Sequence, residues 1–519
     1  MRKRLNKNRL IALSIVFTAL YLWAASKLVF LIVHSEQFHS TNGSVKQIRN
    51  KIVDKNNYIL AYTKPTVSLY LDPSRFPEAF DPWLGANFPE AASRLPDLRR
   101  RGSKFIWLDR HSGRLEEVKK LRIPGIHSRD DYERIYPFHK FTSILLGFCD
   151  VDGNGQAGIE YLLNNRIQHE AVKLSIDIVK QKMLHEIMFQ AVEHYEADGG
   201  SGIIIELDTG NIGRIRAMVS FPVPLLKSDF LLNQNRNRNF DQVEVGSVLK
   251  LLNVAQALES GKYRADTLVD ARGPLKIGDF EINDFFGANR MITVSESLWR
   301  SSNIANARIA LRLGKKMQRE YYKKLGLLDQ VEYLPGCRLS PILPKKWRKS
   351  TTATLAYGYG VGITTLHLAK AILSIVTGFE SALSMLEDEI PKHHSGKRLF
   401  SKSTVETIKQ LMQQVVQNNL KSTLNIPGYS IGAKTGTANL LVNGKYEQGK
   451  NFVTLATVAP LENPKFLIIL QMTNPKKDRL LRGNYTTAGN VLSIYMKLVL
   501  KNIIAMEAIQ ISQKNPSRG

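Results

Sequence analysis

The sequence predicts an α/β or α+β protein that follows a single N-terminal transmembrane helix, and three observations support this. A long apolar run lies near the start of the chain, at residues 10–33. Mostly apolar runs of strand length lie at both ends of the second half, at 203–207, 215–221, 452–459 and 466–472. Apolar residues recur with helical spacing at 247–258, 293–313, 404–416 and 488–504. Strands at both ends with helices between them predict one α/β or α+β domain over about residues 200–505.

The N-terminal run has the features of a membrane anchor. Basic residues without an acidic neighbour precede it at Arg2, Lys3, Arg4, Lys7 and Arg9. Residues 10–33 are long enough to span a bilayer if Lys27 extends its ammonium to the headgroups. The basic flank predicts a cytoplasmic tail over residues 1–9, a single pass through the inner (plasma) membrane and an extracytoplasmic remainder.

A cleaved signal peptide is the alternative reading of this segment. Ala24, Ala25 and Ser26 are small enough for a cleavage site, but the apolar sequence resumes after them. We therefore expect an uncleaved anchor.

Composition narrows the class of protein. The chain has 519 residues, 43% of them hydrophobic, which is typical of a globular protein and excludes whole-chain disorder. Two cysteines, Cys149 and Cys337, can form neither a disulfide framework nor a four-cysteine zinc site. The net charge of +26 indicates an anionic partner, but the sequence contains no nucleic-acid-binding motif. We therefore expect no nucleic-acid partner, and predict that the charge holds the protein near anionic polymers or lipid headgroups.

A glycine-rich stretch at 198–202 divides the exported part in two. We interpret Asp198-Gly-Gly-Ser-Gly202 as a linker, after a helix predicted over 171–196. The predicted domains are 34–197, which is non-catalytic, and 198–519, which carries the motifs described next.

The first motif is Ser247-Val-Leu-Lys250, at the start of a predicted helix. Residues i and i+3 share one helix face, so the serine hydroxyl and the lysine amine can meet. A serine needs a neighbouring base to become a nucleophile, and a lysine whose pKa is lowered by burial can be that base. Alone, this pattern is more often a solvated helix face.

Two further motifs follow. Ser301-Ser302-Asn303 precedes a helical stretch, and an N-cap serine pair is its simplest interpretation. Lys434-Thr435-Gly436-Thr437 offers a lysine and hydroxyls that can bind a carboxylate, beside a glycine that lets a substrate backbone approach closely. A β-turn near a strand is the alternative.

The three motifs together, in this order and spacing, resemble the signature of penicillin-binding proteins and serine β-lactamases. The chain is similar over nearly its whole length to class B penicillin-binding proteins, and within them to the cell-division (FtsI-type) group. The matching segments are Arg49 to Asn56, FIWLDR at 105–110, IPGI at 123–126, Arg134 to Pro137, Gly147 to Glu160, LSIDIVKQ at 174–181, YGYGVGITTLHLAKA at 357–371 and VNGKY at 442–446.

The resemblance implies an architecture and a role for each motif residue. Residues 34–197 would form an elongated pedestal, and 198–519 a transpeptidase domain with an antiparallel sheet flanked by helices. Ser247 would be the acyl-accepting nucleophile, Lys250 its base and Ser301 a proton relay. Asn303 would hydrogen-bond the substrate's peptide amide, and Lys434 and Thr435 would bind its carboxylate. Gly436 would let the substrate backbone approach, and Thr437 would add a hydroxyl and a backbone N–H that forms an oxyanion hole with the N–H of Ser247.

The resemblance also implies the reaction and the partners. The reaction would be D,D-transpeptidation of peptidoglycan stem peptides, with no cofactor or metal and with β-lactams as covalent inhibitors. A SEDS-type (FtsW-like) polymerase and other divisome membrane proteins would be partners. An elongation-type transpeptidase and a β-lactam-binding sensor or scaffold without turnover are the alternatives. Asn418-Asn419-Leu420 departs from the family's usual Gly-Thr-Gly, so the loop beside the site is expected to differ.

Overall fold

The computed structural model describes residues 17–23, 27, 48–164, 170–208, 210–223, 236–278, 280–391, 395–442, 445–476 and 486–508. The chain divides into two units, Met1–Arg49 and Asn50–Gly519. Of the predicted anchor at 10–33, only residues 17–23 and 27 are described, and they are helical. The predicted cytoplasmic tail, 1–9, lies outside the described residues.

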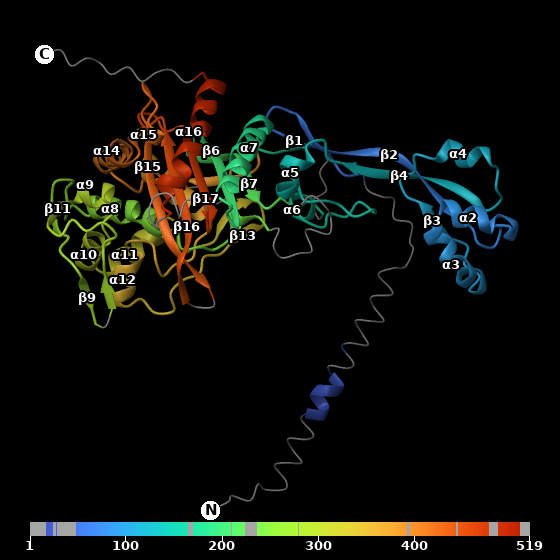
Figure 1. Cartoon of the computed structure of the whole chain (residues 1–519), viewed down its shortest axis with the longest axis horizontal. Coiled ribbons are helices and arrows are strands. Elements are labelled where there is room, and N and C mark those ends of the chain that lie inside the picture. Colours follow the sequence, from blue (N-terminus) through green and yellow to red (C-terminus); the bar gives the residue numbers. More distant parts are fainter. Residues whose placement is uncertain are drawn as a thin grey trace, which may run out of the picture. The chain divides into compact units, whose positions relative to one another are not determined.

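The first part of the larger unit is built on a five-stranded sheet (Figure 1). Its strands are β1 (Ile52–Val53), β2 (Ile59–Leu71), β3 (Ile106–Asp109), β4 (Ile126–Ile135) and β5 (Val172–Lys173). The helices of this part are η1 (Glu78–Phe80), α2 (Asp81–Asn87), α3 (Pro89–Arg100), α4 (Leu115–Lys120), α5 (His139–Leu146) and α6 (Gly158–Leu162). The long strand β2 pairs antiparallel with β4 from Tyr62↔Ile135 to Leu71↔Ile126, and a small apolar core packs beside it.

Residues that matched the family motifs hold this part together. Arg134 and Glu160 form an ion pair with Nε and Oε1 2.8 Å apart, and their side chains are 5% and 0% exposed. The buried carboxylate of Asp54 accepts hydrogen bonds from the backbone N–H groups of Tyr58, at 2.9 Å, and Ile178, at 3.0 Å. Asp54 therefore connects the first strand to the helix that begins the second part.

The second part has a six-stranded sheet in the order β14-β7-β6-β17-β16-β15. Its strands are β6 (Gly199–Leu207), β7 (Ile212–Phe221), β14 (Ala382–Ser384), β15 (Gly432–Val442), β16 (Lys445–Ala459) and β17 (Phe466–Thr473). Neighbouring strands are antiparallel except β14 and β7, which are parallel. The four strand-like runs of the sequence therefore form adjacent strands, β7-β6-β17-β16.

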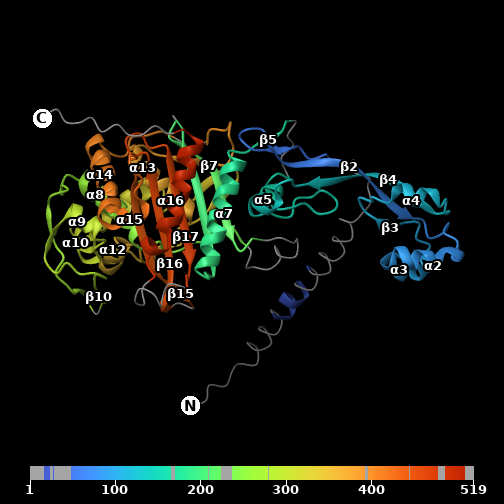
Figure 2. The same cartoon turned by 45° about the horizontal axis from the view of Figure 1, so that its top comes forward.

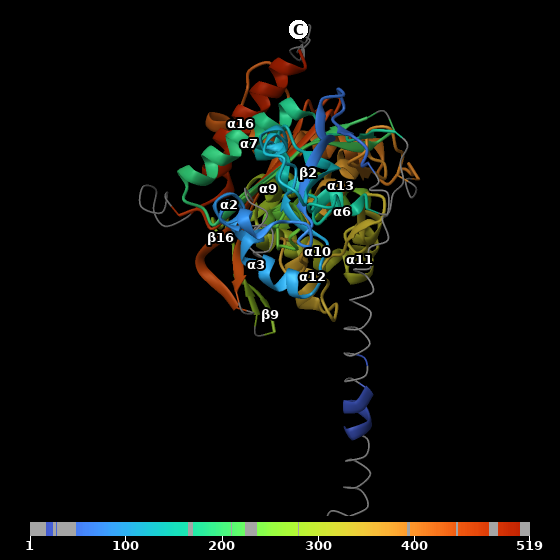
Figure 3. The ribbon, with the colours of Figure 1, turned by 90° about the vertical axis from the view of Figure 1, so that its right-hand side faces the viewer.

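Helices bury both faces of this sheet. Helices α7 (Ile178–His194) and α16 (Ala488–Met506) lie side by side on one face, in one apolar cluster with Ile204 of β6 (Figures 2 and 3). Helices α8 (Lys250–Glu259), α13 (Thr365–Thr377) and α14 (Lys402–Asn419) belong to the other cluster, with Ile203 and Ile205. Because both faces are buried, these strands read as continuous apolar runs rather than alternating ones.

The remaining helical elements of the second part are the 3₁₀ turns η3 (Arg238–Phe240) and η4 (Gly246–Leu249) and the helices α9 (Val294–Trp299), α10 (Asn303–Leu313), α11 (Lys315–Lys324), α12 (Lys349–Leu355) and α15 (Lys421–Leu424). Its short strands pair as β8 (Leu268–Asp270) with β11 (Met291–Thr293), β9 (Leu275–Ile277) with β10 (Phe280–Ile282), and β12 (Val331–Leu334) with β13 (Cys337–Leu339).

Three sequence-based interpretations are wrong in detail. The glycines at 199–202 are not a linker but the start of β6, where Gly200 lets α7 approach: a Cβ there would lie 2.6 Å from the Val192 side chain. The helix predicted over 171–196 begins only at Ile178, after β5. The helix predicted over 293–313 is two helices, separated at 300–302.

One described helix, α16, has the length and hydropathy of a membrane span, and 39% of it is buried inside the protein. Its apolar face packs on β16 and α7, so the helix belongs to the domain core. Among the described residues, Cys149 and Cys337 form no disulfide, as the sequence predicts.

Candidate active site

Ser247 and Lys250 meet at the start of α8. Ser247 lies in the 3₁₀ turn η4 and is half-buried, whereas Lys250 is the first residue of α8 and is 0% exposed. The Lys250 Nζ lies 2.9 Å from the Ser247 Oγ, within hydrogen-bond distance. The contact predicted from the i, i+3 spacing is therefore confirmed.

Lys250 also joins the first motif to the second. Its Nζ lies within hydrogen-bond distance of the backbone carbonyl of Ser301, of the Ser301 Oγ at 3.1 Å and of the Asn303 Oδ1 at 2.7 Å. The fold thus brings together residues that are more than fifty positions apart in sequence, and all of these acceptors are neutral.

Ser301 and Ser302 have different functions in the turn between α9 and α10. Ser302 is the N-cap of α10, and its Oγ accepts from the Ala305 N–H at 3.1 Å. Ser301 has φ +58°, a left-handed conformation that is uncommon for a non-glycine residue and costs of order 1–3 kcal/mol. The N-cap interpretation is confirmed for Ser302, whereas Ser301 is held in a strained turn facing Lys250.

The third motif lies on β15, the edge strand next to η4. Lys434 is 1% exposed, and its Nζ donates to the Ser301 Oγ at 3.2 Å and to the Thr435 carbonyl at 2.9 Å. Thr435 and Thr437 are half-buried. The Thr437 hydroxyl also accepts from the Ala488 N–H at 3.2 Å, which ties the motif to the first residue of α16.

Two glycines let the turn and the strand touch. A Cβ at Gly436 would lie 2.3 Å from the Val245 carbonyl oxygen, and one at Gly246 would lie 2.8 Å from the Thr437 carbonyl oxygen. Gly246 also has φ +59°, which a side chain would disfavour. The backbones of Ser247 and Thr437 are therefore close neighbours. Gly436 is required by contact within the protein, which the sequence did not reveal.

Burial lowers the pKa of both lysines, and the neighbouring Lys434 lowers the pKa of Lys250 further. The pKa of Lys250 lies well below its ordinary 10.5, because its ammonium would be desolvated and would face that of Lys434; Asp284 acts in the opposite direction. Burial lowers the pKa of Lys434 to about 7. A neutral Lys250 can accept the hydroxyl proton of Ser247, which is what a serine nucleophile requires.

No motif in the sequence indicates that Asn283 and Asp284 belong to the site. The Asp284 carboxylate accepts from the Ser302 Oγ at 2.6 Å and from the Ile304 N–H at 2.9 Å. The Asn283 carbonyl accepts from the Asn303 Nδ2 at 2.8 Å. The dipeptide follows β10 and lies twenty residues before the motif, so no local pattern links the two.

Two further segments, Asn418-Asn419-Leu420 and VNGKY at 442–446, make hydrogen bonds to residues close in sequence to the motifs. Asn419 of the departing Asn418-Asn419-Leu420 segment donates to the carbonyl of Trp299, just before the Ser301 turn. Tyr446, from the VNGKY segment, donates to the Glu244 carboxylate at 3.0 Å. Residues 443–444 of that segment lie outside the described residues. The described side chains include no group of three or more His, Cys, Asp or Glu that could hold a metal ion.

Comparison with known proteins identifies the family. The model of the penicillin-binding protein transpeptidase domain matches residues 200–497, more than half of the chain. This chain belongs to the penicillin-binding protein transpeptidase family. The resemblance to class B penicillin-binding proteins is confirmed, since curated FtsI and PenA proteins match over most of the chain.

Similar proteins include the probable peptidoglycan D,D-transpeptidase FtsI of Caulobacter vibrioides, 28% identical over 88% of this chain and 81% of its own. The peptidoglycan D,D-transpeptidase FtsI of Escherichia coli is 27% identical over 91% of this chain and 86% of its own. The probable peptidoglycan D,D-transpeptidase PenA of Neisseria gonorrhoeae is 27% identical over 86% and 82%.

Solved structures support the fold. A peptidoglycan synthetase from Bifidobacterium adolescentis superposes with a TM-score of 0.71 at 18% identity, covering 91% of this chain and 97% of its own. The transpeptidase domain of Burkholderia pseudomallei penicillin-binding protein 3 superposes with a TM-score of 0.56 at 24% identity, covering 66% and 98%. The predicted mixed α/β transpeptidase fold is therefore confirmed.

Proposed function

We propose that this protein is a serine-type peptidoglycan D,D-transpeptidase that cross-links stem peptides through an acyl-enzyme. The observation that carries the proposal is the run of hydrogen bonds from Ser247 through Lys250 and Ser301 to Lys434. It joins an accessible hydroxyl to a buried amine whose pKa is lowered, and to a second serine that can pass a proton onward.

In the first step, the Ser247 Oγ attacks the carbonyl carbon of the penultimate D-Ala of a stem pentapeptide, and its proton moves to the Lys250 Nζ. The backbone N–H groups of Ser247 and Thr437 stabilise the oxyanion, which the close approach of η4 to β15 favours. The C–N bond then breaks. The terminal D-Ala amine leaves with a proton supplied by Lys250 through Ser301.

In the second step, an amine of a neighbouring stem attacks the ester and gives up its proton along the same path. The Ser247 oxygen leaves and is reprotonated. Asn303 hydrogen-bonds the substrate peptide, and Lys434 with Thr435 binds its carboxylate; Gly436 and Thr437 form the strand along which the substrate lies. These roles need no cofactor and no metal.

Labelling of the full-length protein in detergent with a fluorescent penicillin tests the acyl-enzyme. We expect covalent label on the wild type and none on Ser247→Ala of unchanged melting temperature. Cross-linking of a pentapeptide stem to an acceptor amine then tests turnover. Label without cross-linking would contradict transpeptidation and favour the sensor or scaffold; no label on the folded wild type would contradict the acyl-enzyme itself.

We further propose that the protein acts at the division septum, anchored in the inner membrane by residues 10–33 with its N-terminus cytoplasmic. The apolar run, the FIWLDR and VNGKY segments and the relatives named FtsI support this. Its partners would be a SEDS-type (FtsW-like) polymerase and other divisome proteins. A fluorescent fusion is expected to form a midcell band, and a dispersed lateral signal would favour the elongation-type alternative.

A further inference from the structure

The residues Asn283 and Asp284 bind Ser302 and Asn303 of the second motif and Ile304, which follows it. Asp284 holds the Ser302 hydroxyl and the Ile304 N–H, and Asn283 holds the side-chain amide of Asn303, all at 2.6–2.9 Å. We call this pair the 283–284 clamp. The motif residue it leaves unbound is Ser301, whose carbonyl and hydroxyl both contact Lys250.

We propose that the 283–284 clamp is a positioning element for acylation, which fixes Ser301 and Asn303 against the Lys250 amine. This inference rests on the proposed function and adds residues that the three motifs do not contain. Asp284 and Asn283 touch the motif rather than the reacting atoms, so they are positioning residues.

The backbone at Ser301 shows why a clamp is needed. A left-handed serine persists only where its surroundings hold it. The hydrogen bond of the α10 N-cap, from the Ala305 N–H to the Ser302 Oγ, fixes Ser302 within the helix. Asp284 accepts from the same Ser302 hydroxyl and from the Ile304 N–H. The turn is therefore also held by a residue outside the helix. Release of Asp284 would let Ser301 relax and withdraw its carbonyl and hydroxyl from Lys250.

The clamp also orients the Asn303 amide. Because Nδ2 donates to the Asn283 carbonyl, Oδ1 is directed to the Lys250 Nζ at 2.7 Å. The opposite orientation would place two donors against each other. The clamp therefore determines that Asn303 presents its oxygen, a hydrogen-bond acceptor, to Lys250.

Asp284 has an electrostatic effect as well. The charged groups that act on Lys250 are Lys434, which lowers its pKa in addition to burial, and Asp284, which opposes both. Removing the Asp284 charge would lower the pKa of Lys250 further. Since acylation requires neutral Lys250, the acid limb of the acylation rate would move to lower pH.

Penicillin acylation of the full-length protein, measured from pH 5 to pH 10, tests the clamp. Asp284→Asn keeps an oxygen acceptor but no charge, and Asp284→Ala removes both; Asp266→Ala, an exposed aspartate of the same region, is the control. We expect Asp284→Ala to lose about 10- to 100-fold in rate. Asp284→Asn should keep most of the rate, with its acid limb at lower pH.

A wild-type rate in Asp284→Ala, or an Asp284→Asn profile that superposes on the wild-type profile, would overturn the proposal. If Asp284→Ala does not fold, the Asp284→Asn profile still decides. Loss of labelling in the wild type would instead count against the proposed function.

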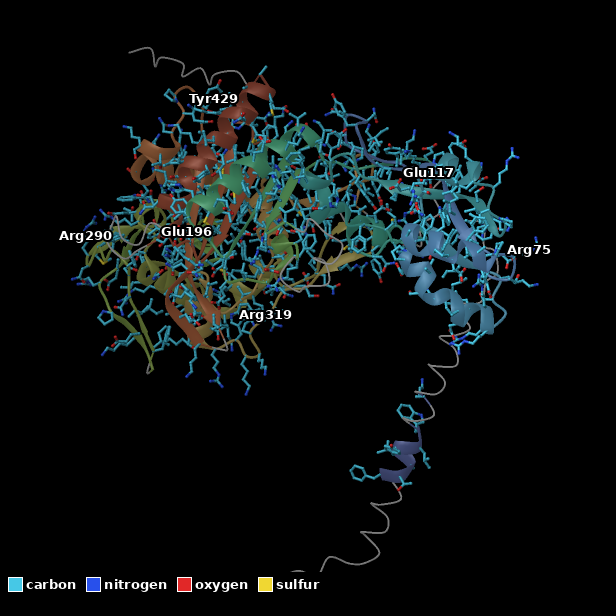
Figure 4. The ribbon with its side chains drawn as sticks, turned by 45° about the vertical axis from the view of Figure 1, so that its right-hand side comes forward. Arg75, Glu117, Glu196, Arg290, Arg319 and Tyr429 are labelled. Atoms are coloured by element: carbon cyan, nitrogen blue, oxygen red, sulfur yellow. The ribbon has the colours of Figure 1, made fainter. Side chains whose placement is uncertain are left out.

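A second observation concerns the charge. Eleven Lys or Arg and only three Asp or Glu lie between Arg312 and Lys349, whereas the whole chain has 72 and 46. The exposed basic residues of α11 and of the segment entering α12 form what we call the α11–α12 basic surface: Lys315, Lys316, Arg319, Lys323, Lys324, Lys345, Lys346, Arg348 and Lys349. Arg319 lies on the lower side of the transpeptidase domain in Figure 4. Part of the excess positive charge of the chain is therefore concentrated on this surface rather than spread evenly along the sequence.

Buried polar contacts hold the two halves of this surface together. The Trp347 indole N–H donates to the Gln318 Oε1 at 3.1 Å, and the Gln318 Nε2 donates to the Thr352 carbonyl at 2.9 Å. Tyr322, 1% exposed, donates to the Leu355 carbonyl at 2.8 Å. The basic residues are therefore displayed on a fixed framework.

We infer that the α11–α12 basic surface binds the carboxylates of peptidoglycan stem peptides, as a second contact with the glycan strand. The inference rests on the proposed function, because each uncross-linked stem ends in a carboxylate and a strand is then a polyanion. Helix α10 leads from Asn303 to this surface over a rise of ~16 Å, so the contact is separate from the site yet within reach of one strand.

Co-sedimentation of the full-length protein with uncross-linked glycan strands tests this surface. The variant is Lys316→Glu/Arg319→Glu/Lys323→Glu, and the control is Arg94→Glu/Lys119→Glu/Lys120→Glu, which changes the net charge equally in the other part. We expect about a tenfold loss of binding for the variant alone, weakening further with salt, at unchanged penicillin acylation.

Equal binding by variant and control would overturn the inference. So would a loss seen only with anionic phospholipid vesicles, which would identify a lipid surface instead. Failure of the proposed function would show separately, as loss of acylation in all the proteins.

Discussion

Two lysines of this protein are both buried, but their pKa values are shifted in opposite directions. Lys250 in the site is 0% exposed, and Lys180 of α7 is 3% exposed. Lys180 donates to Asp177 at 2.8 Å and pairs with Glu507, also at 2.8 Å. Although burial alone would lower the pKa of Lys180, these carboxylates raise it. The pKa of Lys250 is lowered, by burial and by Lys434.

The difference lies in the partners rather than in burial. Lys180 is a charged group that joins the start of α7 to the end of α16. Lys250 has neutral acceptors and a second amine nearby, which favours its neutral form. A buried lysine is therefore a structural cation where carboxylates surround it, and a candidate base where they do not.

Replacing Lys250 should separate activity from stability most strongly. Lys250→Met removes the base, and we expect penicillin acylation to slow by about 10²–10⁴-fold. The melting temperature should stay the same or rise, because an amine that is costly to bury is gone. Stopped-flow acylation and thermal melting measure the two effects, and a large fall in melting temperature would contradict this contrast.

Replacing Lys180 should have the reverse effect. Lys180→Met leaves Asp177 and Glu507 facing an apolar side chain, which costs about 3 kcal/mol of the free energy of unfolding. This cost is at the lower end of the usual range for breaking a buried ion pair, because Lys55, with its Nζ 3.7 Å from the Asp177 Oδ2, still balances part of the charge. Urea denaturation measures the cost. The acylation rate per folded molecule should be that of the wild type, and a loss of rate would show that the two regions are coupled.

Lys434→Gln should move the pH dependence of acylation. Protonated Lys434 lowers the pKa of Lys250, so its removal raises that pKa, and the acid limb should shift to higher pH. Since the pKa of Lys434 is about 7, the difference from wild type should be largest below pH 7. The position of the limb is the readout, because the rate itself also reflects substrate binding; an unshifted limb would refute the coupling.

Glu507→Gln should give the smallest effect, about 1 kcal/mol of stability at pH 7. Although burial alone would raise it, hydrogen bonds from Lys180 and Lys465 lower the pKa of Glu507 from 4.5 to about 2. The stabilisation is present above pH 4.5 and is lost as the pH falls toward 2. Melting curves across this range should converge for wild type and Glu507→Gln at the acid end, and parallel curves would contradict the pairing.

In the transpeptidase part, the helices and strands could be predicted from the sequence more accurately than the residues at which they begin and end. Apolar runs identified β6, β7, β16 and β17, because burial on both faces leaves a continuous pattern. The glycines at 199–202 suggested a linker, but small residues also occur where a helix packs close to a strand. That contact involves α7, and no local pattern in the glycines reveals it.

The site shows the same limit. The i, i+3 spacing was enough to place Lys250 beside Ser247. The break at Ser301 was not predicted, because a serine pair reads as an ordinary N-cap and the left-handed turn depends on distant contacts. The Asp284 contact joins residues twenty positions apart across a loop, which only the three-dimensional structure reveals.

The proposed mechanism requires a neutral Lys250, whereas Lys180 should stay charged. NMR titration of the full-length protein with ¹³Cε-labelled lysine, with Lys250→Met and Lys180→Met as assignment controls, tests it directly. We expect the Lys250 resonance to titrate well below the Lys180 resonance and well below the ordinary lysine pKa of 10.5. A Lys250 that stays protonated up to its ordinary pKa of 10.5 would contradict its role as the base for Ser247.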